Sequence, residues 1–167
     1  MADQSGQSRQ SLRTRIWRYA PLLFWMAVIF FASTGTFSGD NTSRLLRPFL
    51  LWLFPEMSEA RIAFLHILTR KLGHFAEYAV LGLLAARAFA GSSRRLLHEH
   101  WVAASVILVA AYAFLDEFHQ SFVSSRTGSI FDCLIDIAGG LFALICLKYF
   151  KRSKTKLEYP QKSFRSR

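Results

Sequence analysis

Four long apolar segments constrain the fold of this chain more than any other feature of its sequence. They cover residues 16–33, 72–90, 101–115 and 130–149. A helix needs about 20 apolar residues to cross about 30 Å of hydrocarbon, and each segment approaches that length. The third is short unless its helix continues through the polar residues that follow. The sequence therefore predicts an all-α membrane protein, in which four transmembrane helices form a small bundle within residues 16–150.

The composition agrees with a membrane location and argues against a soluble, nucleic-acid-binding protein. Hydrophobic residues make up 52% of the chain, so a soluble domain of 167 residues would expose a large apolar surface. The formal net charge is +10, but the basic residues flank the apolar segments instead of forming one patch. This arrangement is typical of the cytoplasmic face of a membrane. The predicted partner is the lipid bilayer, and nucleic acid is a poor explanation of the charge.

The distribution of Lys and Arg also predicts the orientation of the helices. Fifteen of the 21 basic residues lie in the N-terminal segment, around the loop between the second and third apolar segments, and at the C-terminus. The other loops hold six, so both termini are predicted to lie in the cytoplasm. We expect a multi-pass protein of a bacterial-type cytoplasmic (inner) membrane. Residues 1–15 and 151–167 are predicted to be disordered cytoplasmic tails.

The first outer loop is long and carries an apolar stretch of its own. Residues 44–55 are too few to span a bilayer, and Pro48 interrupts them. An interfacial or a re-entrant segment is therefore expected there. Ser58, which follows this stretch, could cap a helix that runs unbroken into the second apolar segment.

Ionisable residues lie within or beside three of the apolar segments, at helical spacing. Asp116 and Gln120 share one helix face, and Glu117 lies some way off it. Glu77, Asp116 and Asp132 lie about 15, 22 and 24 Å above the predicted cytoplasmic boundary. A charge at mid-bilayer costs about 2.5–3.5 kcal/mol, so such residues should face one another across the bundle. The sequence predicts a polar pocket open to the outer surface, with the candidate residues Lys71, His74, Glu77, Asp116, Glu117, Gln120, Arg126 and Asp132.

The chemistry of these residues leaves several roles open. Lys71 and Arg126 suit a phosphate or carboxylate group, and His74 could serve as an acid or a base near neutral pH. The carboxylates could accept protons, orient the cations or bind a divalent ion. No Cys/His metal spacing, nucleotide-binding loop or nucleophile elbow is present, so the cofactor is unknown and no reaction is assigned.

Structural explanations remain beside the functional one. Glu77, Asp132 and Asp136 need inward-facing partners in any case, so their ion pairs could simply hold the helices together. A non-catalytic membrane scaffold is therefore one alternative, and a small transporter is a weaker one. Close helix packing is also expected at Gly139 and its neighbour Gly140, and at Gly73 and Gly82, because glycines let helices approach.

Two stretches resemble the VanZ-like family, which is named for a teicoplanin-resistance protein. They are residues 70–84, RKLGHFAEYAVLGLL, and residues 116–140, DEFHQSFVSSRTGSIFDCLIDIAGG. One departure is Ser124-Ser125, where the family often has Pro-Gly before the loop arginine. The resemblance implies an integral membrane protein and, for the namesake, reduced susceptibility to a lipoglycopeptide that acts outside the membrane. With the polar pocket, it leads us to expect a protein that binds or modifies an amphiphilic envelope lipid or cell-wall precursor.

Overall fold

The computed structural model describes residues 2–34, 39–123 and 128–158, and their ordered elements are all helices. The outer loop and the segment between the second and third apolar runs contribute one short helix each. The helices are α1 (Ala2–Ala32), α2 (Gly39–Leu53), α3 (Glu59–Ala90), α4 (Arg95–Glu99), α5 (Trp101–Gln120) and α6 (Ile130–Glu158).

Three of the described helices are long and apolar enough to cross a membrane. These spans are Leu12–Ala32 in α1, Trp101–Gln120, which is all of α5, and Ile130–Ser153 in α6. Helix α5 reaches 20 residues because it continues through its polar end. The predicted fourth span, residues 72–90, lies in α3 but is not among them. The prediction of four spans is corrected to three by length and composition, because His74, Glu77 and Arg87 interrupt this part of α3.

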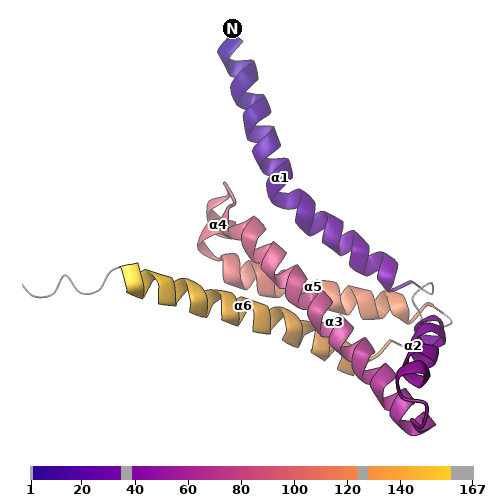
Figure 1. Ribbon diagram of the computed structural model, residues 1–167. Helices are drawn as coiled ribbons and strands as arrows, with labels where there is room; N and C mark the ends of the chain where they lie inside the picture. Colours follow the sequence, from indigo (N-terminus) through magenta and orange to yellow (C-terminus); the bar gives the residue numbers. More distant parts are fainter. Residues whose placement is uncertain (1, 35–38, 124–127, 159–167) are drawn as a thin grey trace, which may run out of the picture.

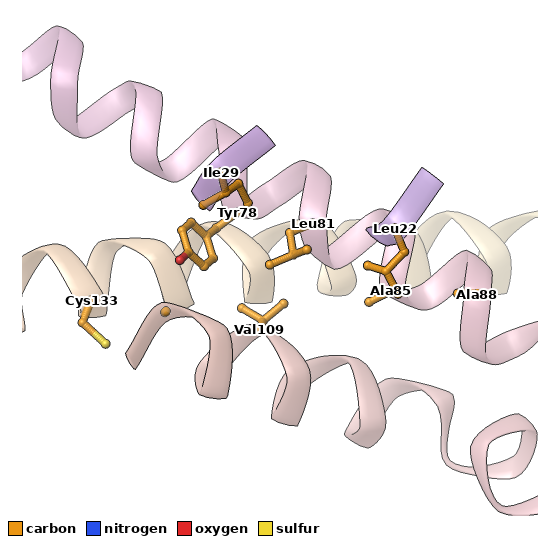
Figure 2. Close-up of a cluster of buried hydrophobic side chains, with 9 residues drawn as sticks. Leu22, Ile29, Tyr78, Leu81, Ala85, Ala88, Val109 and Cys133 are labelled. Atoms are coloured by element: carbon orange, nitrogen blue, oxygen red, sulfur yellow. The ribbon is translucent and has the colours of Figure 1, made fainter. Parts of the chain in front are cut away.

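Helix α3 is the centre of the bundle. It packs against α1, α5 and α6, and its most extensive contact is with α6 (Figure 1). Its buried face consists largely of small residues, among them Ala85 and Ala88, which let the neighbouring helices come close. Leu22 of α1 and Val109 of α5 pack against this face (Figure 2). Van der Waals packing of this kind holds helices together where lipid removes the hydrophobic drive between them.

Glycines make the contact between α3 and α6 possible. A Cβ atom at Gly139 would collide with the backbone carbonyl oxygen of Phe75, and one at Gly82 would lie 3.0 Å from the carbonyl oxygen of Gly140. The predicted close packing at these glycines is confirmed. It is wrong for Gly73, where a Cβ atom would meet nothing within 4 Å.

Helix α1 bends part-way along its length, and its N-terminal half projects away from the bundle (Figure 1). Pro21 lies inside the helix and has no N–H to donate to the carbonyl of Trp17, one turn earlier. Arg87 of α3 donates a hydrogen bond of 3.3 Å to that carbonyl oxygen. The proline therefore frees an acceptor that fastens α1 to α3.

The basic residues gather at one end of the bundle. The Tyr19 hydroxyl lies 2.9 Å from the hydroxyl of Ser92, which joins α1 to the segment after α3. Lys151 of α6 lies 4.7 Å above the ring of Trp101, the first residue of α5. Helices α1 and α5 run from this basic end to the opposite end, and α3 and α6 run back. The cytoplasmic location of the basic end stays a prediction.

At the opposite end, α2 leads into α3. Ser58 occupies the predicted N-cap position and α3 is unbroken, although the Ser58 side chain makes no capping hydrogen bond. The two helices are also joined by Arg47, whose Nη2 lies 2.6 Å from Glu59 Oε1. Whether α2 is interfacial or re-entrant stays a prediction. So does the assignment of residues 1–15 and 151–167 to cytoplasmic tails, into which α1 and α6 extend as helices.

Candidate functional site

Polar side chains of α3, α5 and α6 meet at the end of the bundle opposite the basic end. They form two layers. The rim consists of Arg70, Lys71 and Asp132, near the start of α6. The inner cluster consists of His74, Glu117 and Asp136, about one helical turn deeper.

The rim holds two cations on one carboxylate. Lys71 Nζ lies 2.7 Å from Asp132 Oδ1, and Arg70 Nη2 lies 3.1 Å from Asp132 Oδ2. The Asp132 side chain is only 8% exposed, whereas those of Arg70 and Lys71 are 36% and 37% exposed. Asp132 also sits in the first turn of α6, where the helix dipole favours a negative charge. The rim therefore keeps an excess of positive charge that is open to its surroundings.

Glu117 connects the end of α5 to the start of α6. Its Oε2 accepts a hydrogen bond of 2.6 Å from the backbone N–H of Ser129. The carbonyl oxygen of Ser129 in turn accepts hydrogen bonds from the N–H groups of Asp132 and Cys133, which opens α6. This contact fixes one carboxylate oxygen of Glu117 and leaves Oε1 facing the interior.

The inner cluster is almost fully enclosed. Asp136 is 0% exposed and the His74 side chain is 12% exposed, with His74 Nδ1 3.2 Å from Asp136 Oδ1. One side-chain atom from each of His74, Glu117 and Asp136 lies within 4.8 Å of the other two. Nitrogen and carboxylate oxygen are both ligands of divalent transition metals, so these three residues could hold one ion.

Two further contacts border the inner cluster. Gln120 Nε2 donates a hydrogen bond of 3.0 Å to Asp116 Oδ2, and both side chains are buried. Tyr78 lies one turn below His74 on α3 and is 0% exposed, and its ring lies 6.5 Å from that of Tyr112. Tyr112 donates its hydroxyl hydrogen to the carbonyl oxygen of Met26. Tyr78 and Tyr112 lie on the side of the cluster that faces the middle of the bundle, whereas Gln120 lies at the polar end of α5.

The structure brings most of the predicted residues together, but not all of them. Lys71 meets Asp132 as expected, and His74 and Glu117 lie in the same cluster. Glu77 contributes no atom to this cluster; its backbone carbonyl accepts a hydrogen bond of 2.9 Å from Trp25 Nε1 of α1. Arg126 lies outside the described residues. That these residues form a functional site stays a prediction.

Arg70 and Asp136 belong to the site but not to the candidate set that the sequence gives. Asp136 lies four residues after Asp132, so both share one face of α6, and this spacing was the signal. Arg70 precedes Lys71 directly, and an arginine at such a boundary is more often a membrane-edge anchor. In the structure Arg70 and Lys71 both donate a hydrogen bond to Asp132, and this shared contact assigns Arg70 to the site rather than to a membrane-edge anchor.

An apolar groove of about 540 Å³ lies between α3 and α6, on the side of the basic end. It begins at Phe75, next to His74, and extends to Phe150. Apolar side chains line it along its whole length, among them Leu83 and Leu147. The polar site and the apolar groove therefore lie next to each other on α3 and α6.

The comparisons with known proteins assign a family to this arrangement. A family model described as VanZ/LLP1 matches residues 19–151, which is most of the chain. The chain belongs to the VanZ/LLP1 family. The matched residues of this VanZ/LLP1 member include the whole rim and the whole inner cluster, so the resemblance of residues 70–84 and 116–140 is confirmed. Neither the curated proteins nor the solved structures contain a match to the chain.

Proposed function

We propose that this VanZ/LLP1 protein binds or modifies an amphiphilic envelope lipid or cell-wall precursor, whose anionic headgroup lies against the rim. The supporting observation is that Arg70 and Lys71 share one nearly buried carboxylate while each stays more than one-third exposed. A single carboxylate balances only one of the two charges. A phosphate or carboxylate of a ligand would balance the other, with Arg able to bind it through two parallel hydrogen bonds.

The surroundings of the rim favour an amphiphile over a soluble anion. The groove that starts at Phe75 offers apolar side chains to an acyl chain, and Phe131 and Leu134 are exposed near the start of α6. A lipid could place its headgroup at the rim and keep its chain in hydrocarbon. In this proposal the basic end is cytoplasmic, so the rim faces the outer leaflet of the inner membrane.

In this proposal α3 is the central helix, surrounded by the three candidate spans. Tyr78, Leu81 and Ala85 are buried at 0% exposure, so the face of α3 that carries His74 and Tyr78 turns toward protein. A helix that is surrounded by three others need not be as apolar as one that faces lipid. Its lower hydropathy is therefore compatible with a central position in the membrane.

The namesake of the family suggests a consequence in the cell. A protein that holds or alters a cell-wall precursor at the outer leaflet would change how much of it a lipoglycopeptide encounters. We therefore include altered glycopeptide susceptibility in the proposal.

The buried pair of Asp116 and Gln120 and the link from Glu117 to Ser129 favour a second candidate function. Both are internal contacts that join or stabilise helices. A non-catalytic scaffold would need no more than these. It predicts that substitutions in the rim lower the amount of protein in the membrane without a separate effect on lipid binding.

Native mass spectrometry of the full chain from a mild detergent tests the two functions. A hydrogen bond to a charged group contributes about 1.5–3 kcal/mol, so Arg70→Gln with Lys71→Gln should reduce the lipid-bound fraction at least about tenfold. Arg126→Ala is expected to act in the same direction. The matched control is Arg94→Gln with Arg95→Gln, which removes two charges from the exposed basic end.

The expected result is an anionic lipid adduct on the wild type and on the control, and its loss from the rim variants at normal membrane abundance. The lipid proposal is wrong if the wild type carries no adduct, or if the rim variants and the control carry it equally. Reduced abundance of the rim variants, with lipid retained by the protein that remains, would support the scaffold.

A further inference from the structure

The inner cluster carries more negative charge than its described neighbours balance. Asp136 is fully buried, and neither of its carboxylate oxygens forms a hydrogen bond with the described residues. The same holds for Glu117 Oε1 and for His74 Nδ1 within that part of the chain. Enclosed polar atoms without partners are strongly unfavourable, so most such atoms in proteins have a partner, a water or an ion.

The nearest described cations already pair with a carboxylate outside the inner cluster. Lys71 and Arg70 point their charged groups at Asp132 in the rim. A protonated His74 would balance only one of the two carboxylates, and its contact with Asp136 lacks hydrogen-bond geometry. A divalent ion with a neutral imidazole would balance Glu117 and Asp136 completely.

The geometry points to a bound metal ion. We infer that His74, Glu117 and Asp136 bind one divalent transition-metal ion, Zn²⁺ or Mn²⁺, through one atom each. Ligands about 2.1 Å from a tetrahedral ion lie about 3.4 Å apart, and the three atoms here lie within 4.8 Å of one another. Small side-chain rotations close that difference.

The choice of metal follows from the ligand types. Cu(I) and iron–sulfur clusters require sulfur ligands, whereas this site offers one imidazole nitrogen and two carboxylates. The nitrogen ligand also disfavours Ca²⁺, which prefers oxygen. Three protein ligands also leave a position open for water or a ligand, which is typical of catalytic rather than structural zinc sites.

The surroundings already resemble the outer shell of a metal site. The hydrogen bond from Ser129 holds Glu117 Oε2, so that Oε1 is oriented toward the cluster. The Tyr78 hydroxyl is buried without a partner among the described residues, one turn of α3 below His74. It is available to a water on the ion. Such outer contacts orient ligands and tune the metal.

Metal content of the tag-free full chain tests this inference. The protein is purified in mild detergent, treated with chelator, incubated with Zn²⁺ or Mn²⁺, and measured by native mass spectrometry and elemental analysis. We expect one ion per chain in the wild type. Asp136→Asn and Glu117→Gln should bind at least tenfold more weakly. The matched control, Glu56→Gln, removes an exposed carboxylate outside the rim and the cluster and should keep the ion.

A spectroscopic measurement on the wild type covers the case in which the variants fail to fold. Electron spin-echo spectra of the Mn²⁺ form should show coupling to one imidazole nitrogen. Absence of a stoichiometric ion in the wild type, absence of nitrogen coupling, or equal binding by folded Asp136→Asn would overturn the inference.

A further variant, Arg126→Gln, tests whether Arg126 balances the charge of the cluster in place of a metal. In that case the wild type would bind no ion and this variant would gain one. Ion and lipid adducts differ in mass and are scored separately, so failure of the metal inference leaves the lipid proposal untouched, and the reverse also holds.

Discussion

Replacement of Gly139 by alanine tests how closely α3 and α6 approach. The added Cβ atom would fall on the backbone carbonyl oxygen of Phe75, and backbone cannot rotate away as a side chain can. The two helices must therefore separate by about 1 Å, and a gap of that size forfeits a quarter to a half of the dispersion energy of each affected contact. Because overpacking costs about 1–3 kcal/mol and the obstacle here is rigid, we expect Gly139→Ala to lower the free energy of unfolding by about 2–3 kcal/mol.

Gly73→Ala is the matched control on the same pair of helices. A Cβ atom there meets nothing within 4 Å, so only helix propensity changes, and alanine should stabilise by about 0.5–1 kcal/mol. Both variants are unfolded by denaturing detergent in mixed micelles and followed by circular dichroism. The packing described for α3 and α6 is refuted if Gly139→Ala is as stable as the wild type, or if the two variants lose stability equally.

Two further predictions concern contacts of α3 with α1 and α2. Trp25→Phe removes the hydrogen bond to the carbonyl oxygen of Glu77 and should lower the free energy of unfolding by about 1 kcal/mol in the same assay; an unchanged value would contradict the contact. The hydrogen bond from Arg47 lowers the pKa of Glu59 below its usual value, so the link between α2 and α3 is complete above the ordinary glutamate pKa and is lost as the pH falls through the lowered one. The protection factors of α2 amides, which correct for the slower intrinsic exchange at low pH, should therefore fall at low pH in the wild type and show no such step in Arg47→Gln; a step in both would sink this explanation.

The pairing of rim and cluster residues could be predicted because helix geometry is regular. A rise of 1.5 Å per residue places Lys71 at the height of Asp132, and His74 near that of Asp136. The cost of charge in hydrocarbon then requires that they face one another. Both pairs are present in the structure. The family could be recognised from the same residues, because their spacing is specific.

The position of Glu117 could not be predicted from helix periodicity. Its face on α5 differs from that of Asp116, so the sequence places it off the polar stripe. In the structure it turns to the cluster because the backbone of Ser129 returns over the end of α5 and donates a hydrogen bond to it. This position of the Ser129 backbone depends on tertiary packing, which the local sequence pattern does not reveal. The predicted number of spans was wrong because His74, Glu77 and Arg87 lower the hydropathy of this part of α3, so it does not qualify as a span by length and composition.

The location of the polar end on the outer side of the membrane is the central claim, and thiol labelling tests it most directly. Phe122 at the polar end and Leu96 at the basic end are both 72% exposed, which makes them matched positions for single cysteines in a chain without Cys133 and Cys146. A membrane-impermeant maleimide should label Phe122→Cys in cells whose inner membrane is intact, and Leu96→Cys only after that membrane is permeabilised. The opposite pattern would place the rim and the inner cluster on the cytoplasmic side and contradict the account.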